Sequence, residues 1–329
     1  MKAVIPVAGI GTRLRPHTHT QPKALIPIAG KPIIGHIIDT LINSGIKEYV
    51  FIIGYMGDKI ENYISTQYPM IDANFVIQTT GKGTGHAIWL AKDYLKNDEL
   101  LIVLGDTIVD VNIKELINLD ETILCVKKVD DPRMFGVAEM NTDGTIKRLV
   151  EKPSIPKSNL ALVGIYRVKE TAKLFDSIEY IMQEKIIKQN EYHLTDALMR
   201  MIDTGVVMRA IHVDNWFDCG KKEILLDTNA TLLKRLNFDT SKYGYQNTII
   251  IPPVFIGSSC QISNSIIGPN VSVGDNAILN YAILKDSIIG PDSQIEYAIL
   301  DRSVIGNDAL LKGMKQSLNI GDSTEINFE

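Results

Sequence analysis

The sequence has few cysteines and no strong excess of either charge. Its 329 residues include three cysteines, and 34 Lys and Arg against 39 Asp and Glu leave a formal net charge of -5. Cys125, Cys219 and Cys260 are odd in number and widely scattered, which indicates neither a disulfide framework nor a zinc site, so we expect a reducing cytoplasm. Because acidic and basic residues are interspersed along the chain, a nucleic-acid partner is not expected.

Long apolar runs are also missing. No run approaches the roughly 20 apolar residues that cross a bilayer, so we expect no membrane partner. The apolar start of the chain is too short for the core of a signal peptide and leads directly into a glycine-rich turn, which favours a first strand. Hydrophobic residues make up 45% and charged residues 22%, and the length suits one large domain with a smaller one.

Short apolar runs alternate with helical periodicity over the first two thirds of the chain. The expected strands are Lys2–Ala8, Tyr49–Ile53, Phe75–Gln78 and Leu100–Leu104, and the expected helices are Pro32–Asn43, Asp58–Tyr68 and Thr84–Leu95. This alternation predicts an α/β domain over residues 1–235, with a Rossmann-like, mixed but mainly parallel sheet and helices on both faces. Ligands bind such sheets beyond the carboxyl ends of the strands, so site residues should follow the apolar runs.

The last third of the chain has a different period. Ile-Gly and Val-Gly pairs recur up to Ile320-Gly321, and Tyr281–Gly290 aligns with Tyr297–Gly306 sixteen residues later. Aliphatic residues return every five or six positions, as in a parallel β-helix that turns one of them inward on each face. Residues 249–329 thus resemble the left-handed β-helix of hexapeptide-repeat proteins, since a β-sandwich would not repeat at a fixed period. The polar residues 236–248 are the predicted linker.

A glycine-rich turn with basic residues follows the first strand. Gly9 and Gly11 allow a sharp turn whose N–H groups can approach an anion, and Arg13 and Arg15 carry guanidinium groups suited to phosphate oxygens. The turn is not a Walker A loop, because no Lys-Ser/Thr pair follows at the required spacing. It is not a dinucleotide fingerprint either, because Leu14 replaces the third glycine. Taken alone, Gly-x-Gly is equally typical of a plain strand-to-helix turn.

Together with its neighbours, this turn resembles the signature of sugar-1-phosphate nucleotidylyltransferases. Gly-x-Gly-Thr-Arg-Leu is followed by Pro22-Lys23-Ala24-Leu25-x-Pro27. Further similar motifs come in the family's order: Leu104-Gly105-Asp106, Phe135-Gly136-Val137, Glu151-Lys152-Pro153, Ser158–Tyr166 and Trp216–Gly220. The most similar branch is that of glucose-1-phosphate thymidylyltransferases with an added β-helix. One departure is Ala8, where that branch often carries glycine.

The resemblance implies an Mg²⁺-dependent enzyme of the EC 2.7.7 class. A sugar-phosphate oxygen attacks the α-phosphorus of a nucleoside triphosphate, and pyrophosphate leaves. Arg13 and Lys23 are implied to hold the triphosphate, Asp106 and Asp218 to share one Mg²⁺, and Lys152 to bind the sugar phosphate. Asp106 ends an apolar run, a place that suits a hard cation. Either aspartate could instead cap a helix or stabilise a turn.

The resemblance also implies two substrate subsites. The nucleotide-binding residues are Ala8, Gly9, Gly11, Thr12, Arg13, Lys23, Gln78, Gly83, Thr84 and Gly105. The sugar-phosphate-binding residues are Gly136, Glu151, Lys152, Asn159 and Tyr166. An amide such as that of Gln78 can donate to a carbonyl of thymine or uracil and accept from the ring N–H, which favours dTTP or UTP. Glucose 1-phosphate is the favoured sugar, and Thr195 or Asp196 is expected to cap a helix.

Other functions stay open at this point. A chain of the same fold could be an inactive subunit that senses nucleotide sugars, or could use another pair such as GTP and mannose 1-phosphate. An acyltransferase would need a histidine base on the β-helix, whereas all six histidines precede it. A dehydrogenase is disfavoured by the missing third glycine. The flat aliphatic faces of the coils predict a homo-oligomer.

Overall fold

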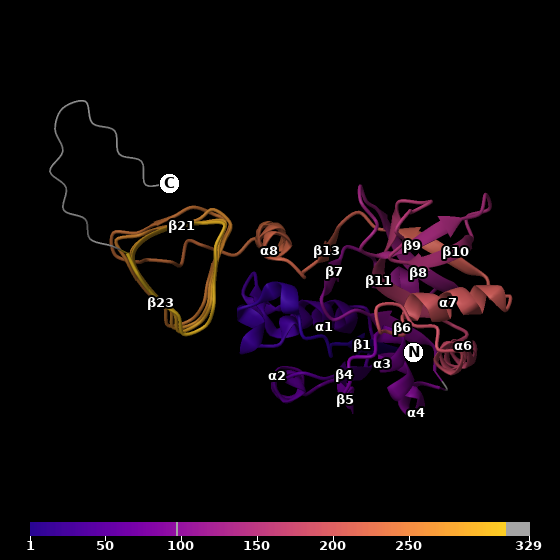
Figure 1. Ribbon diagram of the computed structural model, residues 1–329. Coiled ribbons are helices and arrows are strands. Elements are labelled where there is room, and N and C mark those ends of the chain that lie inside the picture. The colour runs from indigo at the N-terminus through magenta and orange to yellow at the C-terminus, as the bar shows by residue number, and fades with distance from the viewer. Residues whose placement is uncertain (97, 314–329) are drawn as a thin grey trace. The chain divides into compact units, whose positions relative to one another are not determined.

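The computed structural model describes residues 1–96 and 98–313 (Figure 1). The chain forms two compact units. The boundary between them lies between Thr228 and Asn229, within helix α8 (Lys222–Leu236). The predicted linker, residues 236–248, therefore starts at the last residue of this helix. Residues 314–329 of the predicted β-helix, with the Ile320-Gly321 pair, lie outside the described residues. No helix in the described part of the chain has the length and apolarity of a membrane span.

A nine-stranded sheet forms the centre of the first unit (Figure 1). Four neighbouring strands are parallel, in the order β5 (Asp72–Ile77), β4 (Glu48–Ile53), β1 (Lys2–Pro6) and β6 (Leu100–Val103). The remaining strands are β8 (Thr122–Lys128), β9 (Gly136–Met140), β10 (Ile146–Glu151), β11 (Leu160–Val168) and β12 (Met208–His212). The mixed, Rossmann-like α/β fold is thus confirmed for this unit.

The second half of this sheet is more antiparallel than expected. Strand β11 runs antiparallel to β6, β8 and β9, and β10 runs antiparallel to β9, while β12 alone adds a parallel pairing with β8. Strands β9 and β10 are joined by a short turn, and such a connection permits only antiparallel pairing. The sequence alternation that predicts parallel strands therefore holds for the first half of the sheet only.

Helices cover both faces of this sheet. They are α1 (Ile33–Asn43), α2 (Gly57–Gln67), α3 (Thr84–Leu90), α4 (Lys92–Leu95), α6 (Thr171–Gln183) and α7 (Leu194–Asp203). Val50 and Ile52 of β4 point into a buried cluster with α3, α4, α6 and α7. Ile53 points to the opposite face, because side chains alternate along a strand, and there its Cβ lies 2.9 Å from the position of a Cβ on Gly57 of α2.

The bounds of the predicted elements differ somewhat from the observed ones, and two of these differences have a clear local cause. The predicted helix Thr84–Leu95 is interrupted at Ala91, whose N–H bonds to the carbonyl of Ile88 and whose carbonyl accepts from Tyr94. These tighter bonds, three residues apart, break the regular helix where the sequence contains neither glycine nor proline. The first strand ends at Pro6, two residues earlier than expected, because the chain already turns toward the glycine-rich segment.

The second unit is built from parallel strands that stack at the repeat interval. One ladder contains β14 (Ile249–Ile250), β17 (Ile266–Ile267), β19 (Ile278–Lys285), β21 (Gln294–Asp301) and β23 (Leu310–Lys312), with β16 (Gln261–Ser263) on β19. A second ladder contains β15 (Val254–Ile256), β18 (Val271–Val273), β20 (Ile288–Ile289) and β22 (Val304–Ile305). Seen end-on, the successive coils overlie one another (Figure 1). This stacking of parallel strands fits a β-helix.

Buried aliphatic ladders and polar corners hold these coils in register. Ile262, Leu279 and Ile295 pair across successive coils and are buried in the apolar interior. At the corners, Asn270 and Asn276 have left-handed backbones, with φ of 60° and 57°. Asparagine tolerates this conformation better than most residues. The Nδ2 of Asn270 donates to Asp286 at 2.6 Å, so the corner residues also bond from one coil to the next.

Candidate active site

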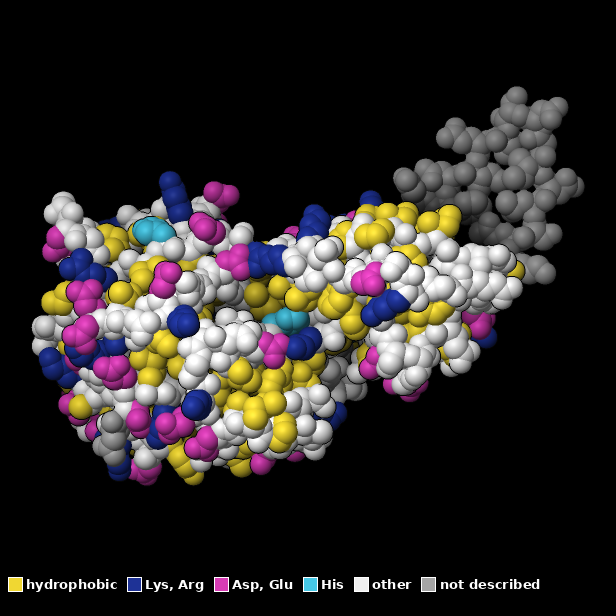
Figure 2. Space-filling model, turned by 180° about the vertical axis from the view of Figure 1, so that it is seen from behind, with side chains coloured by type: hydrophobic (Ala, Val, Ile, Leu, Met, Phe, Trp, Pro, Cys, Tyr) yellow, Lys and Arg dark blue, Asp and Glu magenta, His cyan; other side chains and the backbone are white. Residues whose placement is uncertain are grey.

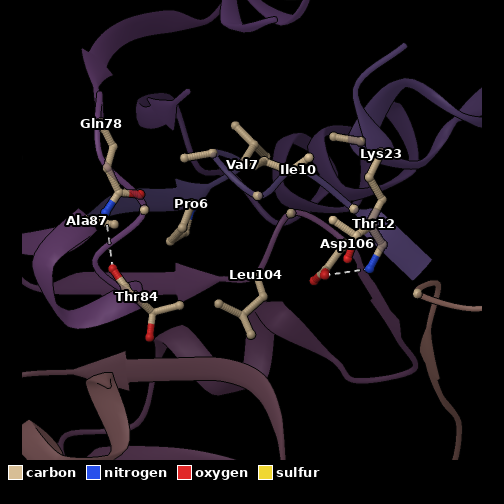
Figure 3. Close-up of a pocket in the computed structure, with 18 of the residues that line it drawn as sticks. Pro6, Val7, Ile10, Thr12, Lys23, Gln78, Thr84, Ala87, Leu104 and Asp106 are labelled. Atoms are coloured by element: carbon tan, nitrogen blue, oxygen red, sulfur yellow. Dashed lines mark hydrogen bonds and ion pairs between the residues drawn. The ribbon is translucent and has the colours of Figure 1, made fainter. Parts of the chain in front are cut away.

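The carboxyl ends of β1 and β6 border a cavity of about 500 Å³ (Figure 3). This volume is in the range of small-molecule sites. Every residue predicted to bind the nucleotide lines it: Ala8, Gly9, Gly11, Thr12, Arg13, Lys23, Gln78, Gly83, Thr84 and Gly105. Asp106, one residue beyond Gly105, lines it as well. The cavity thus lies where strand ends in an α/β sheet place ligands.

The glycines around the cavity serve different purposes. Gly11 has φ of 69°, and a Cβ there would lie 3.0 Å from the Lys23 Cβ. A Cβ at Gly105 would lie 2.1 Å from Cγ1 of Val7, so this glycine allows β6 and β1 to pack closely. In contrast, a Cβ at Gly9 would meet no protein atom within 4 Å. Gly11 and Gly105 are thus required by the fold, whereas Gly9 leaves room inside the cavity.

One lysine joins two carboxylates from distant parts of the chain. The Nζ of Lys23 lies 2.6 Å from Oδ2 of Asp106 (Figure 3) and 3.5 Å from Oδ1 of Asp218. Arg13 lies beside the same cluster, with Nη2 3.5 Å from Oδ2 of Asp218. Burial raises the pKa of Asp106, but the charge and hydrogen bond of Lys23 outweigh it and hold the pKa below its ordinary value. Asp106 is therefore a carboxylate at neutral pH.

A short strand pairing brings the two aspartates together. Strand β13 (Trp216–Asp218) runs antiparallel to β7 (Thr107–Val109), which places Asp218 opposite Thr107. The N–H of Cys219 also donates to the carbonyl of Asp106 at 3.1 Å. Gly220, which sequence reasoning did not single out as a site residue, lines the cavity beneath Arg13. A Cβ there would lie 2.5 Å from the arginine Nη2.

The Asp106 and Asp218 carboxylates suit a hard divalent cation. Both contact the Lys23 ammonium group, so positive charge already lies between them. Mg²⁺ prefers oxygen ligands and is often held by one or two carboxylates together with waters and substrate phosphates. Among the described residues, no group of three or more His, Cys, Asp or Glu side chains could hold a metal by itself. The donor set therefore fits an ion that shares its ligands with a phosphate substrate.

A second cluster contains two of the predicted sugar-site residues. Gly136 of β9 pairs with Glu151 of β10, and a Cβ on Gly136 would lie 3.1 Å from Oε2 of Glu151. Thr195 Oγ1 donates to the same Oε2 at 2.7 Å. The expectation that Thr195 caps a helix is therefore wrong. The N-cap of α7 is His193, the N–H of Leu194 donates to Thr84 Oγ1 at 3.2 Å, and the Thr195 hydroxyl is left to orient Glu151.

The other predicted residues of the sugar site differ in placement. Lys152 has a left-handed φ of 41°, which is costly for a lysine, and its Nζ donates to Oε1 of Gln189 at 3.2 Å. Asn159 is exposed in the segment before β11. Tyr166, expected to line the pocket, is instead 5% exposed within the apolar core. Burial there, and next the charge of Glu151, raise the pKa of Tyr166, so its hydroxyl stays neutral.

The segment from Gln189 to Thr195 links the two clusters. Glu191 lines the cavity, Gln189 bonds to Lys152, and Thr195 bonds to Glu151. The cavity side is fixed by backbone bonds, because the N–H of Gly85 donates to the carbonyl of Tyr192 at 2.9 Å. Sequence reasoning assigned this segment only a capping role. The run of polar residues directly before a helix was the signal in the sequence that could have indicated a role at the site.

The comparisons with known proteins agree with this geometry. Residues 2–235 match the family described as nucleotidyl transferase, so the chain belongs to that family. It is 30% identical to the glucose-1-phosphate thymidylyltransferase of Streptomyces antibioticus, covering 89% of this chain and 88% of the relative. It is 33% identical to the bifunctional protein GlmU of Methanococcus vannielii, over 89% and 78% of the two chains. The similarity to sugar-1-phosphate nucleotidylyltransferases is confirmed, and with it the EC 2.7.7 class.

Other similar proteins align over a smaller share of the chain. The low-salt glycan biosynthesis nucleotidyltransferase Agl11 of Haloferax volcanii is 32% identical over 71% of this chain, and the match spans 66% of that relative. A solved UDP-glucose pyrophosphorylase in complex with UDP-glucose aligns with a TM-score of 0.63 and 25% identity, over 71% of this chain and 98% of the other. The solved relatives thus share the α/β fold that carries the cavity.

The different surroundings of Gly9 and Gly105 lead to a testable contrast. We expect Gly9→Ala to leave the free energy of unfolding unchanged or slightly raised, because its methyl group meets no protein atom. It should nevertheless weaken binding of nucleoside triphosphates. Gly105→Ala should lower the free energy of unfolding by about 1–3 kcal/mol through overpacking. Denaturant unfolding and calorimetric titration with a triphosphate measure both effects, and unchanged affinity in a folded Gly9→Ala protein contradicts the placement of phosphates at this turn.

Proposed function

We propose that this protein joins a nucleoside triphosphate to a hexose 1-phosphate, giving a nucleoside diphosphate sugar and pyrophosphate in an Mg²⁺-dependent reaction. The favoured substrates are dTTP or UTP and glucose 1-phosphate. The observation that carries the proposal is the convergence of Arg13, Lys23, Asp106 and Asp218 at one cavity. The names of the relatives support the same reaction class.

Charge neutralisation is the first task of such a site. Two anionic substrates must approach each other, and nucleotidyl transfer depends more on positioning and electrostatics than on covalent help from the protein. Arg13 and Lys23, which line the cavity, would hold the triphosphate and stabilise the charge that develops on the departing pyrophosphate. The backbone N–H groups around Gly9 and Gly11 would add neutral donors to the same phosphates.

Asp106 and Asp218 would hold Mg²⁺, which neutralises phosphate oxygens when it is bound. In the structure these carboxylates are paired with Lys23 and Arg13. Asp106 and Asp218 would therefore give up these ion pairs to hold the metal, and the Lys23 and Arg13 side chains would be free to bind phosphate oxygens. No charged side chain of the cluster would be left without a partner on the way to the transition state.

The Glu151 cluster would orient the sugar. Glu151 would accept a hydrogen bond from a sugar hydroxyl, and Gly136 would let the sugar ring approach the backbone. Lys152 would bind the phosphate of the sugar phosphate, exchanging its present bond to Gln189. The hydrogen bond from Thr195 would fix which oxygen of Glu151 is free for the sugar.

Three further parts of the proposal concern the chain as a whole. Residues 1–235 would be the catalytic domain and residues 236–248 a linker to a left-handed β-helix over 249–329, in a cytoplasmic protein. An inactive sensing subunit is disfavoured, because such a protein should have lost one or more of Arg13, Lys23, Asp106 or Asp218. An acyltransferase activity of the coils is disfavoured because no histidine follows His212 in the sequence.

A substrate panel tests the proposed reaction. Four nucleoside triphosphates crossed with glucose, galactose, mannose and N-acetylglucosamine 1-phosphates should release pyrophosphate most rapidly for dTTP or UTP with glucose 1-phosphate, and only with Mg²⁺ present. Asp106→Asn should lower kcat/KM at least about 100-fold in a folded protein, whereas Asp93→Asn, at an exposed surface pair, should not. Absence of turnover with every pair refutes the proposal, and a preference for GTP with mannose 1-phosphate refutes the favoured substrates.

A second prediction concerns the hydrogen bond between Thr195 and Glu151. Thr195→Val keeps the shape of the side chain but removes the hydroxyl, so Glu151 loses its 2.7 Å donor. We expect KM for the sugar 1-phosphate to rise about 10-fold or more, as for loss of one charge-assisted bond, with KM for the triphosphate unchanged. Thr195→Ser should retain the normal KM. Equal changes in both KM values would show that Thr195 acts on the fold and not on the sugar subsite.

We further propose that the coils mediate a homo-oligomer. Ile249, Ile266, Ile283 and Ile299 pair in register across successive coils, and three of them are exposed. The rings of Tyr281 and Tyr297 stack beside this row at 4.9 Å. Hydrophobic side chains are visible on the surface of this unit between the charged ones (Figure 2). Such a flat row repeated by the coils can pair with an identical row.

A charge placed in this row should weaken the oligomer. Ile299 is 77% exposed, so Ile299→Lys should leave the coil folded while placing an ammonium group in the contact. Light scattering should then give a lower mass for the variant than for the unaltered chain. The matched control is Ile155→Lys in the first unit, which is 85% exposed and should not change the mass. A monomeric unaltered chain, or an unchanged Ile299→Lys oligomer, contradicts the proposal.

A further inference from the structure

The amide of Gln78 lies in the wall of the cavity and is bonded to the protein itself (Figure 3). Its Nε2 lies 3.2 Å from the carbonyl oxygen of Gly83 and 3.1 Å from Nδ1 of His86. Gln78 and His86 are each 8% exposed. Sequence reasoning assigned base recognition to Gln78.

These two contacts define which way the amide points. A backbone carbonyl can only accept a hydrogen bond, so the amide atom beside Gly83 must be the nitrogen and not the oxygen. That nitrogen can only donate, so Nδ1 of His86 must accept, and the imidazole proton must lie on Nε2. Burial, and next the charge of Lys82, lower the pKa of His86, which keeps its imidazole neutral. Its ring stacks on Trp89 at 6.2 Å.

Both amide hydrogens of Gln78 are therefore in use, and only Oε1 is left for a ligand. This corrects the expectation that the amide both donates to and accepts from the base. An acceptor oxygen matches a base with a ring N–H on its pairing edge, as uracil and thymine have at N3. Cytosine and adenine carry a bare ring nitrogen there and donate only from the exocyclic amine, so Oε1 facing the ring position would meet a second acceptor and be repelled. Guanine has a ring N–H, so this contact acts against cytosine and adenine only.

We propose that His86 is a positioning residue that locks the Gln78 amide as a pure acceptor, and that it thereby selects triphosphates whose base offers a ring N–H. The inference rests on the proposed function and specifies its nucleotide. His86 does not line the cavity; it acts through Gln78 alone. The Gly83 carbonyl favours the same orientation with one hydrogen bond, and His86 adds a second bond by accepting the other amide hydrogen.

Two variants test this role. In His86→Leu one of the two bonds that fix the amide is lost, so the amide can flip more easily and present Nε2 to a base acceptor, and the ratio of kcat/KM for UTP or dTTP over CTP and ATP should fall about 10-fold or more. His86→Asn offers a carbonyl oxygen near the place of Nδ1 and should keep the ratio within about 3-fold of normal. A uniform loss for all four triphosphates in His86→Leu, or an equal loss of discrimination in both variants, overturns the proposal.

A measurement on the unaltered protein keeps the proposal testable if His86→Leu does not fold. Nitrogen-15 spectra of the histidine rings, assigned with His86→Asn, should show the Nε2–H tautomer for His86 at neutral pH. The Nδ1–H tautomer overturns the inference. This readout needs no turnover, so an inactive chain with the Nε2–H tautomer would refute the proposed reaction alone. Calorimetric binding of UMP against CMP should then still favour UMP, and equal affinities would refute the role of His86.

Discussion

The active cavity depends on one buried ammonium group between two carboxylates. Lys23 has a side chain only 9% exposed, and a buried lysine without a partner would lose its charge or destabilise the fold. Asp106 and Asp218 supply that partner charge together. The lysine therefore requires that β7 and β13 pair, because that pairing brings Asp218 beside Asp106. The charges that pair with one another in this cluster are also those that a metal–nucleotide complex would need.

Much of this organisation could be predicted from the sequence because it is local. A strand followed by glycines and basic residues marks the Ala8–Arg13 turn, and an apolar run that ends in Gly105 and Asp106 marks the neighbouring strand end. Both features lie at the cavity. The stacked coils were equally accessible, because each coil repeats the one before it and its partners lie a fixed number of residues away. Periodicity is a local property even where the structure that it produces is extended.

The remaining features are long-range and leave no local pattern. Nothing near Asp218 indicates that three residues of β13 pair with β7, more than a hundred residues earlier. Thr195 stands where a helix cap is common, and only the position of Glu151 shows that its hydroxyl points elsewhere. Tyr166 belongs to a family-like motif, yet the alternation along β11 turns it into the core. In each case the neighbour that decides the role comes from another part of the chain.

The segment before α7 explains how the two proposed subsites can be held at a fixed separation. Backbone bonds tie Tyr192 to Lys82 and Gly85 on the side of the proposed nucleotide subsite, while Gln189 and Thr195 bond to Lys152 and Glu151 on the side of the proposed sugar subsite. Transfer between two bound anions requires that their reacting atoms be aligned closely, since small misplacements cost large factors in rate. A single short segment anchored at both ends meets this requirement better than two independent loops. The His86–Gln78 contact serves the base in the same way, because α3 carries His86 and its first residues, Thr84 and Gly85, are hydrogen-bonded to this segment.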